Sequence, residues 1–393
     1  MNAPSIFRRS LPVTVTSFIN RTGSIGLSII PVILVERQFS SHDSAWIMGF
    51  VKAGGLLGIW LGGWCCDRLG LRRTLLLSFA LSAVGLAPIP FAVSAGALAG
   101  FAFIAQLGNA FYPTSARLLI TQLVEPGERR EAIGWQRTAN NSAQIVAYSL
   151  GAFLGKFGSA VLIWFDALTA LAASIVGTKL LPQVSTAQRP TTEGGRPGTY
   201  GRFLVCTAIT AVFIFLYELY MTAAAAQCRI LFGAEGLSVF SQMMVINTIF
   251  CASLSLFAAR HLTNPARALP VGMLLTGLGL IATFGVSEPS RFTFYLGNFL
   301  LTIGEIVFNA LAGLVLIQLT PPGKKQGQNY GFAMLINYIA RVAGAAAAFP
   351  WVVNASHPLI TVTIGTALGV ALCLLARRIL AETQDLKTAP ASP

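Results

Sequence analysis

The sequence predicts an all-α membrane protein in which twelve transmembrane helices form two pseudo-symmetric six-helix bundles. Composition, a series of apolar runs and an internal repeat support this fold class. Of the 393 residues, 54% are hydrophobic and only 10% are charged, and the mean hydropathy is +0.69. Because soluble domains contain about 25% charged residues, we expect most of this chain to lie in lipid.

Twelve apolar runs are long enough to cross a bilayer, which requires about 20 mostly apolar residues. They lie at about 11–35, 45–66, 74–92, 97–120, 132–155, 159–181, 202–225, 237–259, 268–286, 292–317, 329–353 and 357–376. Segment 182–201, PQVSTAQRPTTEGGRPGTYG, has the composition of a flexible linker. We therefore expect a six-helix half at 1–181, a cytoplasmic linker at 182–201, and a second half with a short cytoplasmic tail at 202–393.

An internal repeat supports the division into halves. GNAFYPTSARLLITQLVEPGERR begins at Gly108, and GEIVFNALAGLVLIQLTPPGKKQ begins at Gly304. Identical residues align without gaps at Gly108/Gly304, Ala116/Ala312, Leu118/Leu314, Gln122/Gln318, Leu123/Leu319, Pro126/Pro322 and Gly127/Gly323. Two parallel six-helix repeats are the expected construction of one large class of transporters.

Basic residues indicate the orientation. With the N-terminus inside, the inner segments contain eighteen Lys and Arg residues, and the outer ones contain four: Arg37, Lys156, Arg229 and Arg291. The positive-inside rule then makes both termini cytoplasmic, in the inner (plasma) membrane. The same rule explains the net charge of +13, and no basic patch interleaved with aromatic residues indicates nucleic-acid binding.

The stretch GWCCDRLGLRR, residues 63–73, combines glycines, an acid and arginines at the end of the second apolar run. We expect Gly63 to allow close approach of a neighbouring helix and Gly70 to allow a tight turn. Asp67 is expected at a helix C-terminus, where the helix dipole disfavours an acid. A basic loop that is merely solvated is the simpler alternative.

This stretch resembles the signature between helices 2 and 3 of the major facilitator superfamily. The resemblance implies that Gly63, Asp67, Arg68, Gly70, Arg72 and Arg73 form a cytoplasmic gate in a transporter that works by alternating access. VTSFINRTGSIGLSIIPVIL and LTIGEIVFNAL look like the drug-exporter branch of that superfamily. Two exporter features are missing, because Ile104 replaces an arginine of helix 4 and Ala147-Tyr148 replaces a Gly-Pro pair of helix 5.

Ionisable residues inside a membrane are costly and usually mark function. The apolar runs contain Arg21, Lys52, Arg137, Asp166, Glu218, Glu305 and Arg341. Lys52 and Asp166 lie near the predicted outer ends of their helices and are expected to extend toward the interface. Arg21, Glu305 and Arg341 lie deepest and are the strongest candidates for function. We expect Asn20-Arg21 to break the first helix near its centre.

Polar side chains form stripes on several predicted helices. In the family that this sequence resembles, the corresponding helices line the central cavity. Glu305 is the candidate for proton coupling, with Glu218 as an alternative carrier. The candidates for the substrate cavity are Asn20, Arg21, Asn109, Tyr112, Asn141, Gln144, Tyr148, Glu218, Asn247, Asn309, Asn337 and Arg341. The alternative is that some of these residues only form hydrogen bonds between helices.

The sequence therefore predicts a secondary transporter that exports a small amphipathic or anionic compound, such as a drug or a secreted siderophore, by proton coupling. Uptake of an organic anion with protons is the alternative. No HExxH or GxSxG motif indicates an enzyme. We expect no cofactor and no metal, and the expected partners are the lipid bilayer, a small-molecule substrate and protons, with the chain as a monomer.

The orientation can be tested by cysteine labelling in intact cells. A membrane-impermeant thiol reagent is expected to modify Lys156→Cys, which lies in an outer segment, and to leave Gly195→Cys unmodified until the cells are permeabilised. The physical reason is the excess of basic residues in the inner segments. Modification of Gly195→Cys in intact cells would contradict the predicted orientation.

Overall fold

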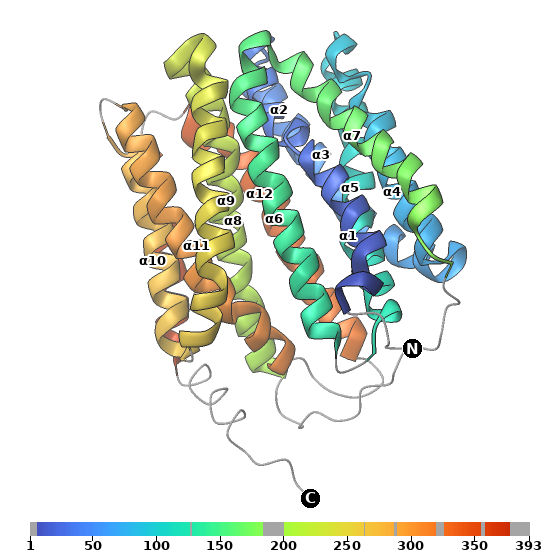
Figure 1. Ribbon diagram of the computed structural model, residues 1–393. Coiled ribbons are helices and arrows are strands. Elements are labelled where there is room, and N and C mark those ends of the chain that lie inside the picture. The colour runs from blue at the N-terminus through green and yellow to red at the C-terminus, as the bar shows by residue number, and fades with distance from the viewer. Residues whose placement is uncertain are drawn as a thin grey trace, which may run out of the picture. The chain divides into compact units, whose positions relative to one another are not determined.

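Helices account for nearly all of the residues described by the computed structural model, which are 6–125, 128–183, 200–262, 264–286, 289–319, 326–354 and 358–377 (Figure 1). Up to the sequence midpoint the helices are α1 (Ile6–Thr22), η1 (Gly26–Ile29), α2 (Ile30–Glu36), α3 (Ser41–Leu69), α4 (Leu71–Leu86), η2 (Ile89–Phe91), α5 (Ala95–Leu123), α6 (Arg129–Leu154), η4 (Gly155–Phe157) and α7 (Ser159–Leu180). Then follow α8 (Tyr200–Phe232), η5 (Gly233–Glu235), α9 (Gly236–His261), α10 (Pro265–Phe284), α11 (Arg291–Leu319), α12 (Gln326–Ala348), η6 (Phe349–Val353) and α13 (Pro358–Leu375).

The helices form two units. Unit 1 comprises Met1–Gln188 and Ala225–Ile249, and unit 2 comprises Arg189–Ala224 and Phe250–Pro393. Helices α8 and α9 are therefore each divided between the units. Most of the predicted linker and of the C-terminal tail, 184–199 and 378–393, lies outside the described residues, so the division at 182–201 stays a prediction.

Each of the twelve apolar runs coincides with helix in the structure. Within the described residues, nine stretches are long and apolar enough to span a membrane, and one of them, Tyr200–Leu254, contains all of α8 and most of α9. Helix α6 is not among the nine, and α13 contributes only the shorter apolar stretch Val362–Leu375. The protein is an all-helical, multi-pass membrane protein, and the count of twelve spans stays a prediction.

The first span is broken near its centre, as the sequence predicts. Helix α1 ends at Thr22, residues 23–25 form a turn, and the chain continues through the short 3₁₀ helix η1 into α2. Ser24 lies in the turn and donates from its hydroxyl to the carbonyl of Arg21 at 2.8 Å. Side-chain bonds of this kind compete with the helical ladder, and Gly23 and Gly26 add backbone freedom on both sides of Ser24.

Glycines set the closest helix contacts at equivalent positions of the repeat. A Cβ atom on Gly108 of α5 would lie 2.6 Å from the backbone nitrogen of Ser82 on α4. A Cβ atom on Gly304 of α11 would lie 2.6 Å from the backbone nitrogen of Thr276 on α10. Since real Cβ atoms do not approach this closely, both positions require glycine for the same packing. Pro126/Pro322 and Gly127/Gly323 of the repeat lie outside the described residues.

The expectation of close helix packing at Gly63 is wrong. A Cβ atom at Gly63 would meet nothing within 4 Å, whereas Cβ atoms at Gly54 and Gly58 would collide with Phe103 and with Leu107 and Ala110 of α5. A Cβ atom at Gly62 would lie 3.1 Å from the Cα of Phe111, a tight contact. These three glycines repeat every four residues and share one face of α3, while the next residue points about 100° away. The glycine motif is real, but it is displaced by one position from the expected one.

Several buried threonines form a hydrogen bond to the backbone one turn earlier. The hydroxyls of Thr74, Thr276 and Thr283 each donate to the carbonyl four residues earlier, at 2.9 Å, and that residue is Gly70, Gly272 or Gly279. The hydrogen bond satisfies the polar atom without a partner from another helix. These residues therefore pack as small apolar side chains.

The glycine contact between α4 and α5 predicts a stability difference along α5. Gly108→Val is expected to lower the thermal midpoint of the detergent-purified protein because its side chain collides with Ser82, a cost of about 1–3 kcal/mol. Gly100→Val is the control, because a Cβ at Gly100 would meet nothing within 4 Å. Equal shifts for both variants would refute the proposed role of Gly108.

Candidate functional site

A cation and an aromatic ring meet beside the break in the first span of unit 1. The guanidinium carbon of Arg21 lies 4.6 Å from the ring centroid of Tyr112 on α5. The Tyr112 hydroxyl donates to Asn140 Oδ1 at 3.0 Å and accepts from Gln136 Nε2 at 3.4 Å, both on α6. A cation over an aromatic face gains about 0.5–2 kcal/mol, with the larger value when desolvated. The structure thus joins two predicted site residues, Arg21 and Tyr112, in one polar network.

Asp166 of α7 does not extend toward the interface, so that expectation is wrong. Its side chain is only 7% exposed, and its Oδ2 accepts a hydrogen bond from the Gly26 amide at 2.9 Å. Arg21 also interacts electrostatically with this carboxylate. The position of Asp166 near the predicted end of its helix suggested that the side chain reaches water. The break in the first span instead provides the Gly26 amide as a hydrogen-bond donor inside the protein.

The polar centre of unit 2 is Arg341 of α12. Its Nε lies 3.6 Å from Glu218 Oε2 on α8, and its guanidinium carbon lies 5.7 Å from the Tyr338 ring centroid. Tyr217 of α8 and Glu305 of α11 also interact electrostatically with Arg341. We call these five residues the Arg341 cluster. It contains one arginine and two carboxylates, so these three groups together carry one excess negative charge. Binding of one proton by either acid brings their net charge to zero.

The two acids of the Arg341 cluster differ in burial. The Glu218 side chain is 7% exposed, and the Arg341 side chain is 39% exposed. Glu305 is half-buried, and the Cys251 thiol lies 3.9 Å from its Oε2, at hydrogen-bond range for sulfur. Sequence reasoning ranked Glu305 above Glu218, whereas the ion pair of Arg341 is with Glu218.

The remaining polar candidates differ in exposure and in partners. Asn337 accepts a hydrogen bond at Oδ1 from the Thr210 hydroxyl at 3.0 Å, which connects α12 to α8. This is a hydrogen bond between helices, the alternative to a role in the substrate cavity. Asn309 is exposed on α11. In unit 1, the buried candidates are Asn20, Tyr148 and Asn247, and the half-buried ones are Asn109, Asn141 and Gln144. The side chain of Arg137 lies outside the described part of the chain.

The gate motif forms the end of α3 and the start of α4. Gly70 has φ +85°, which favours glycine and confirms the predicted tight turn. Arg72 donates to the carbonyl of Thr178 on α7, and the guanidinium carbon of Arg68 lies 6.0 Å from the Trp64 ring. Asp67, Arg68 and Arg73 are exposed. The motif thus links the end of α3 to α4 and α7, and its role as a gate stays a prediction.

Sequence reasoning missed two ionic contacts of unit 1. Arg229, near the end of α8, lies 3.3 Å from Glu36 of α2, and the Ser159 hydroxyl of α7 donates to the same carboxylate at 2.6 Å. Arg9 of α1 donates to both carboxylate oxygens of Glu128, at 2.6 and 2.7 Å. The sequence shows that these residues are charged or polar, but it does not show which residue each of them contacts.

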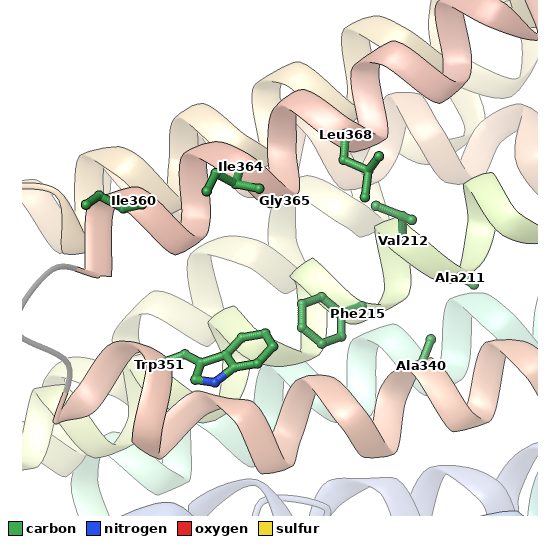
Figure 2. A pocket seen from close by; sticks show the side chains of 9 residues that line it. All are labelled: Ala211, Val212, Phe215, Ala340, Trp351, Ile360, Ile364, Gly365 and Leu368. Carbon is green, nitrogen blue, oxygen red and sulfur yellow. The ribbon is translucent and has the colours of Figure 1, made fainter.

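An apolar cavity of about 560 Å³ opens between α8, α12, η6 and α13 of unit 2 (Figure 2). Its lining residues are Ala211, Val212, Phe215, Ala340, Trp351, Ile360, Ile364, Gly365 and Leu368. The rings of Phe215 and Trp351 lie 6.0 Å apart. None of the predicted site residues lines this cavity, although Ala340 directly precedes Arg341 in α12.

Known proteins resemble this chain in sequence. Residues 12–345 match the family model described as Major Facilitator Superfamily. The chain is 26% identical over 295 residues to a protein named multidrug resistance protein MdtH from Aeromonas salmonicida, covering 71% of this chain and 70% of that protein. A protein of the same name from Aeromonas hydrophila matches with the same identity and coverage.

Solved structures share the fold at low identity. A D-xylose-proton symporter has a TM-score of 0.76 and 16% identity, and the match covers 97% of this chain and 99% of that chain. A mutant of the peptide transporter POT in complex with sulfate has a TM-score of 0.79 and 15% identity, with 94% of each chain covered. The inward-open xylose transporter XylE from E. coli has a TM-score of 0.71 and 14% identity, with 96% of each chain covered.

The ion pair between Glu218 and Arg341 predicts energetic coupling. Glu218→Gln and Arg341→Leu are each expected to destabilise the purified protein, because each removes one member of the ion pair. The loss is expected to be larger for Arg341→Leu, which leaves the buried carboxylate of Glu218 without its partner. The double variant is expected to lose less than the sum, with a coupling of about 0.5–3 kcal/mol.

Thermal unfolding of the two single variants and the double variant measures this coupling. Lys156→Met removes an exposed charge and serves as the control, with an expected effect within about 0.5 kcal/mol. Strictly additive losses would show that the two residues do not interact.

Proposed function

This chain belongs to the major facilitator superfamily, and from that premise we propose that it is a proton-coupled secondary transporter that exports a small amphipathic or anionic compound. That it is a membrane transporter follows from the family. The substrate class, the coupling ion and the direction of transport are the proposal. The Arg341 cluster is the single observation that carries it.

The charge balance of the Arg341 cluster suits proton coupling. Both Glu218 and Glu305 act on one guanidinium, so the cluster has one acid in excess of its base. A proton that binds there cancels this excess, and charge compensation is strongly favoured inside a membrane. We assign the proton to Glu305, because Glu218 is the acid that pairs with Arg341 at 3.6 Å.

The same cluster suits an anionic group on the substrate. Arg341 keeps 39% of its side chain exposed, and a guanidinium can bind a carboxylate or sulfonate through two parallel hydrogen bonds. When Glu305 takes up a proton, less negative charge surrounds Arg341, and an incoming anion is repelled less. Proton binding and anion binding then favour each other, a linkage that suits the alternative of uptake of an organic anion with protons. Export by exchange with protons requires instead that the proton and the substrate compete for the Arg341 cluster.

The apolar part of an amphipathic substrate has a candidate site on the same helices. Phe215 lines the cavity of about 560 Å³ and lies one helical turn before Glu218 on α8. Pockets for drug-sized ligands have volumes of about 300–1,000 Å³ and mostly apolar walls. The two MdtH relatives are named as multidrug resistance proteins, which favours export over the alternative of proton-coupled uptake of an organic anion.

Glu305→Gln tests the assignment of the proton. The amide keeps the shape and can form hydrogen bonds but cannot change charge, so the variant is expected to lose transport driven by a pH gradient while it still binds substrate. Fluorescent amphipathic anions in proteoliposomes report flux, and dye titration of the purified protein reports affinity. Glu125→Gln, the same replacement at an exposed acid outside the Arg341 cluster, is the control.

The outcomes separate the alternatives. Accumulation of the dye against its gradient by Glu305→Gln would refute the role of Glu305. Accumulation in inside-out vesicles with an acidic interior supports export by exchange with protons. Accumulation in right-side-out vesicles with an acidic exterior supports uptake with protons instead.

A further inference from the structure

The apolar cavity of unit 2 opens toward lipid. Its wall residues on α13 are each more than half exposed: Ile360, Ile364 and Leu368. Trp351 of η6, on the opposite wall, is 47% exposed (Figure 2). The lining residues of α8, α12 and η6 lie within two stretches that are long and apolar enough to span a membrane, Tyr200–Leu254 and Phe332–Val353. The open side of the cavity therefore contacts acyl chains, and a ligand can reach it from the bilayer.

Helix α8 forms the base of this cavity because glycines bring its two neighbours close to it. A Cβ on Gly344 of α12 would collide with the carbonyl oxygen of Phe215, and a Cβ on Gly365 of α13 would lie 2.9 Å from Leu216 Cδ2. The rings of Phe215 and Trp351 lie 6.0 Å apart. The cavity is thus a groove that has α12 and η6 on one side, α13 on the other and α8 between them (Figure 2). We call it the α12–α13 groove.

The α12–α13 groove adjoins an ion pair. Ala211, Phe215 and Glu218 are spaced i, i+4 and i+7, so Glu218 continues the face of α8 that lines the groove. On α12, Ala340 lines the groove and Arg341 is the next residue. Arg341 Nε lies 3.6 Å from Glu218 Oε2, and the Arg341 side chain keeps 39% of its surface exposed. An apolar groove that is open to lipid is therefore followed by a cation.

The dimensions of the α12–α13 groove favour a single alkyl chain. Ile360 and Leu368 are eight residues apart on α13, which corresponds to about 12 Å along the helix, and one leaflet of the hydrocarbon core is about 15 Å deep. Arg341 lies near the middle of the stretch Phe332–Val353. The headgroup of a phospholipid stays at the membrane surface, about one leaflet away from Arg341, whereas a single-chain anion can move deeper with its head.

We propose that the α12–α13 groove binds single-chain amphipathic anions that are dissolved in the bilayer, such as alkyl carboxylates and alkyl sulfonates. The chain lies in the groove, and the anionic head binds Arg341 through charge-assisted hydrogen bonds. The inference rests on the proposed function, because it names the substrate class of the same site. It also gives that substrate a route from the membrane instead of from water.

Trp351 serves as the reporter of what occupies the groove. In a variant that keeps Trp351 and has phenylalanine at the other tryptophans, dodecanoate brominated on its chain is titrated into proteoliposomes, because bromine quenches indole fluorescence on contact. We expect quenching of Trp351 that saturates at a low ratio of ligand to lipid. The matched control keeps only Trp60 of α3, which is 69% exposed and outside the groove. Its quenching is expected to rise in proportion to the brominated chain in the bilayer.

The two parts of the site can be tested separately. Brominated dodecanol has the same chain without the charge, and we expect it to need a roughly tenfold higher ratio to lipid for half-saturation, as does dodecanoate with Arg341→Leu. Ala340→Phe fills the groove and is expected to abolish the saturable phase, with Val212→Phe as a second variant should the first fail to fold. Leu374→Phe, at an exposed position of α13 outside the groove, is the control.

Three outcomes would overturn the inference. They are non-saturable quenching of Trp351 like that of Trp60, equal half-saturation by dodecanoate and dodecanol, and stronger saturable quenching by a brominated phospholipid, which would make the groove a site for a structural lipid. Failure of the proposed function gives a different result. Glu305→Gln would then still accumulate substrate against its gradient, while the titration of Trp351, which uses no proton gradient, would be unaffected.

Discussion

Hydrocarbon offers no hydrogen-bond partner, and this constraint explains why several buried polar side chains form their hydrogen bonds within the protein. Threonines form hydrogen bonds within their own helix, as Thr276 does with the carbonyl of Gly272. Asp166 accepts from the amide of Gly26. Because helices in lipid gain little from hydrophobic burial against one another, close packing and such internal partners stabilise the bundle, and the glycine contacts of α3, α5 and α11 follow from the same constraint.

The two units use polar residues differently at corresponding positions of the repeat. Tyr112 and Phe308 are equivalent in the alignment of Gly108 with Gly304. The ring of Tyr112 faces Arg21 at 4.6 Å, whereas the ring of Phe308 stacks on Phe213 with centroids 3.9 Å apart. In unit 2 the cation is instead Arg341, where the alignment has Ile145 in unit 1. The repeat thus preserves helix packing at Gly108 and Gly304, while the charged side chains differ between the two halves.

Much of the fold follows from hydropathy and from the repeat, because helix length and apolar content are local properties of sequence. The break after Thr22 and the turn at Gly70 are also local and were predicted. Which neighbouring helix a glycine packs against, and which residue a charged side chain pairs with, are not local properties of the sequence. The close helix contact was therefore predicted at Gly63, whereas it lies at Gly54, Gly58 and Gly62. The burial of Asp166 was not predicted, and the sequence did not show whether Glu218 or Glu305 pairs with Arg341.

The division of α8 and α9 between the units has a consequence for biosynthesis. Helices α4 and α5 are consecutive, as are α10 and α11, so the glycine-mediated contacts of each pair can form soon after both members enter the membrane, when little chain entropy opposes them. Unit 1, however, includes Ala225–Ile249. The packing of unit 1 therefore cannot be complete when the ribosome finishes the first half of the chain. The surfaces of its N-terminal helices that pack against Ala225–Ile249 stay uncovered until α9 has been inserted.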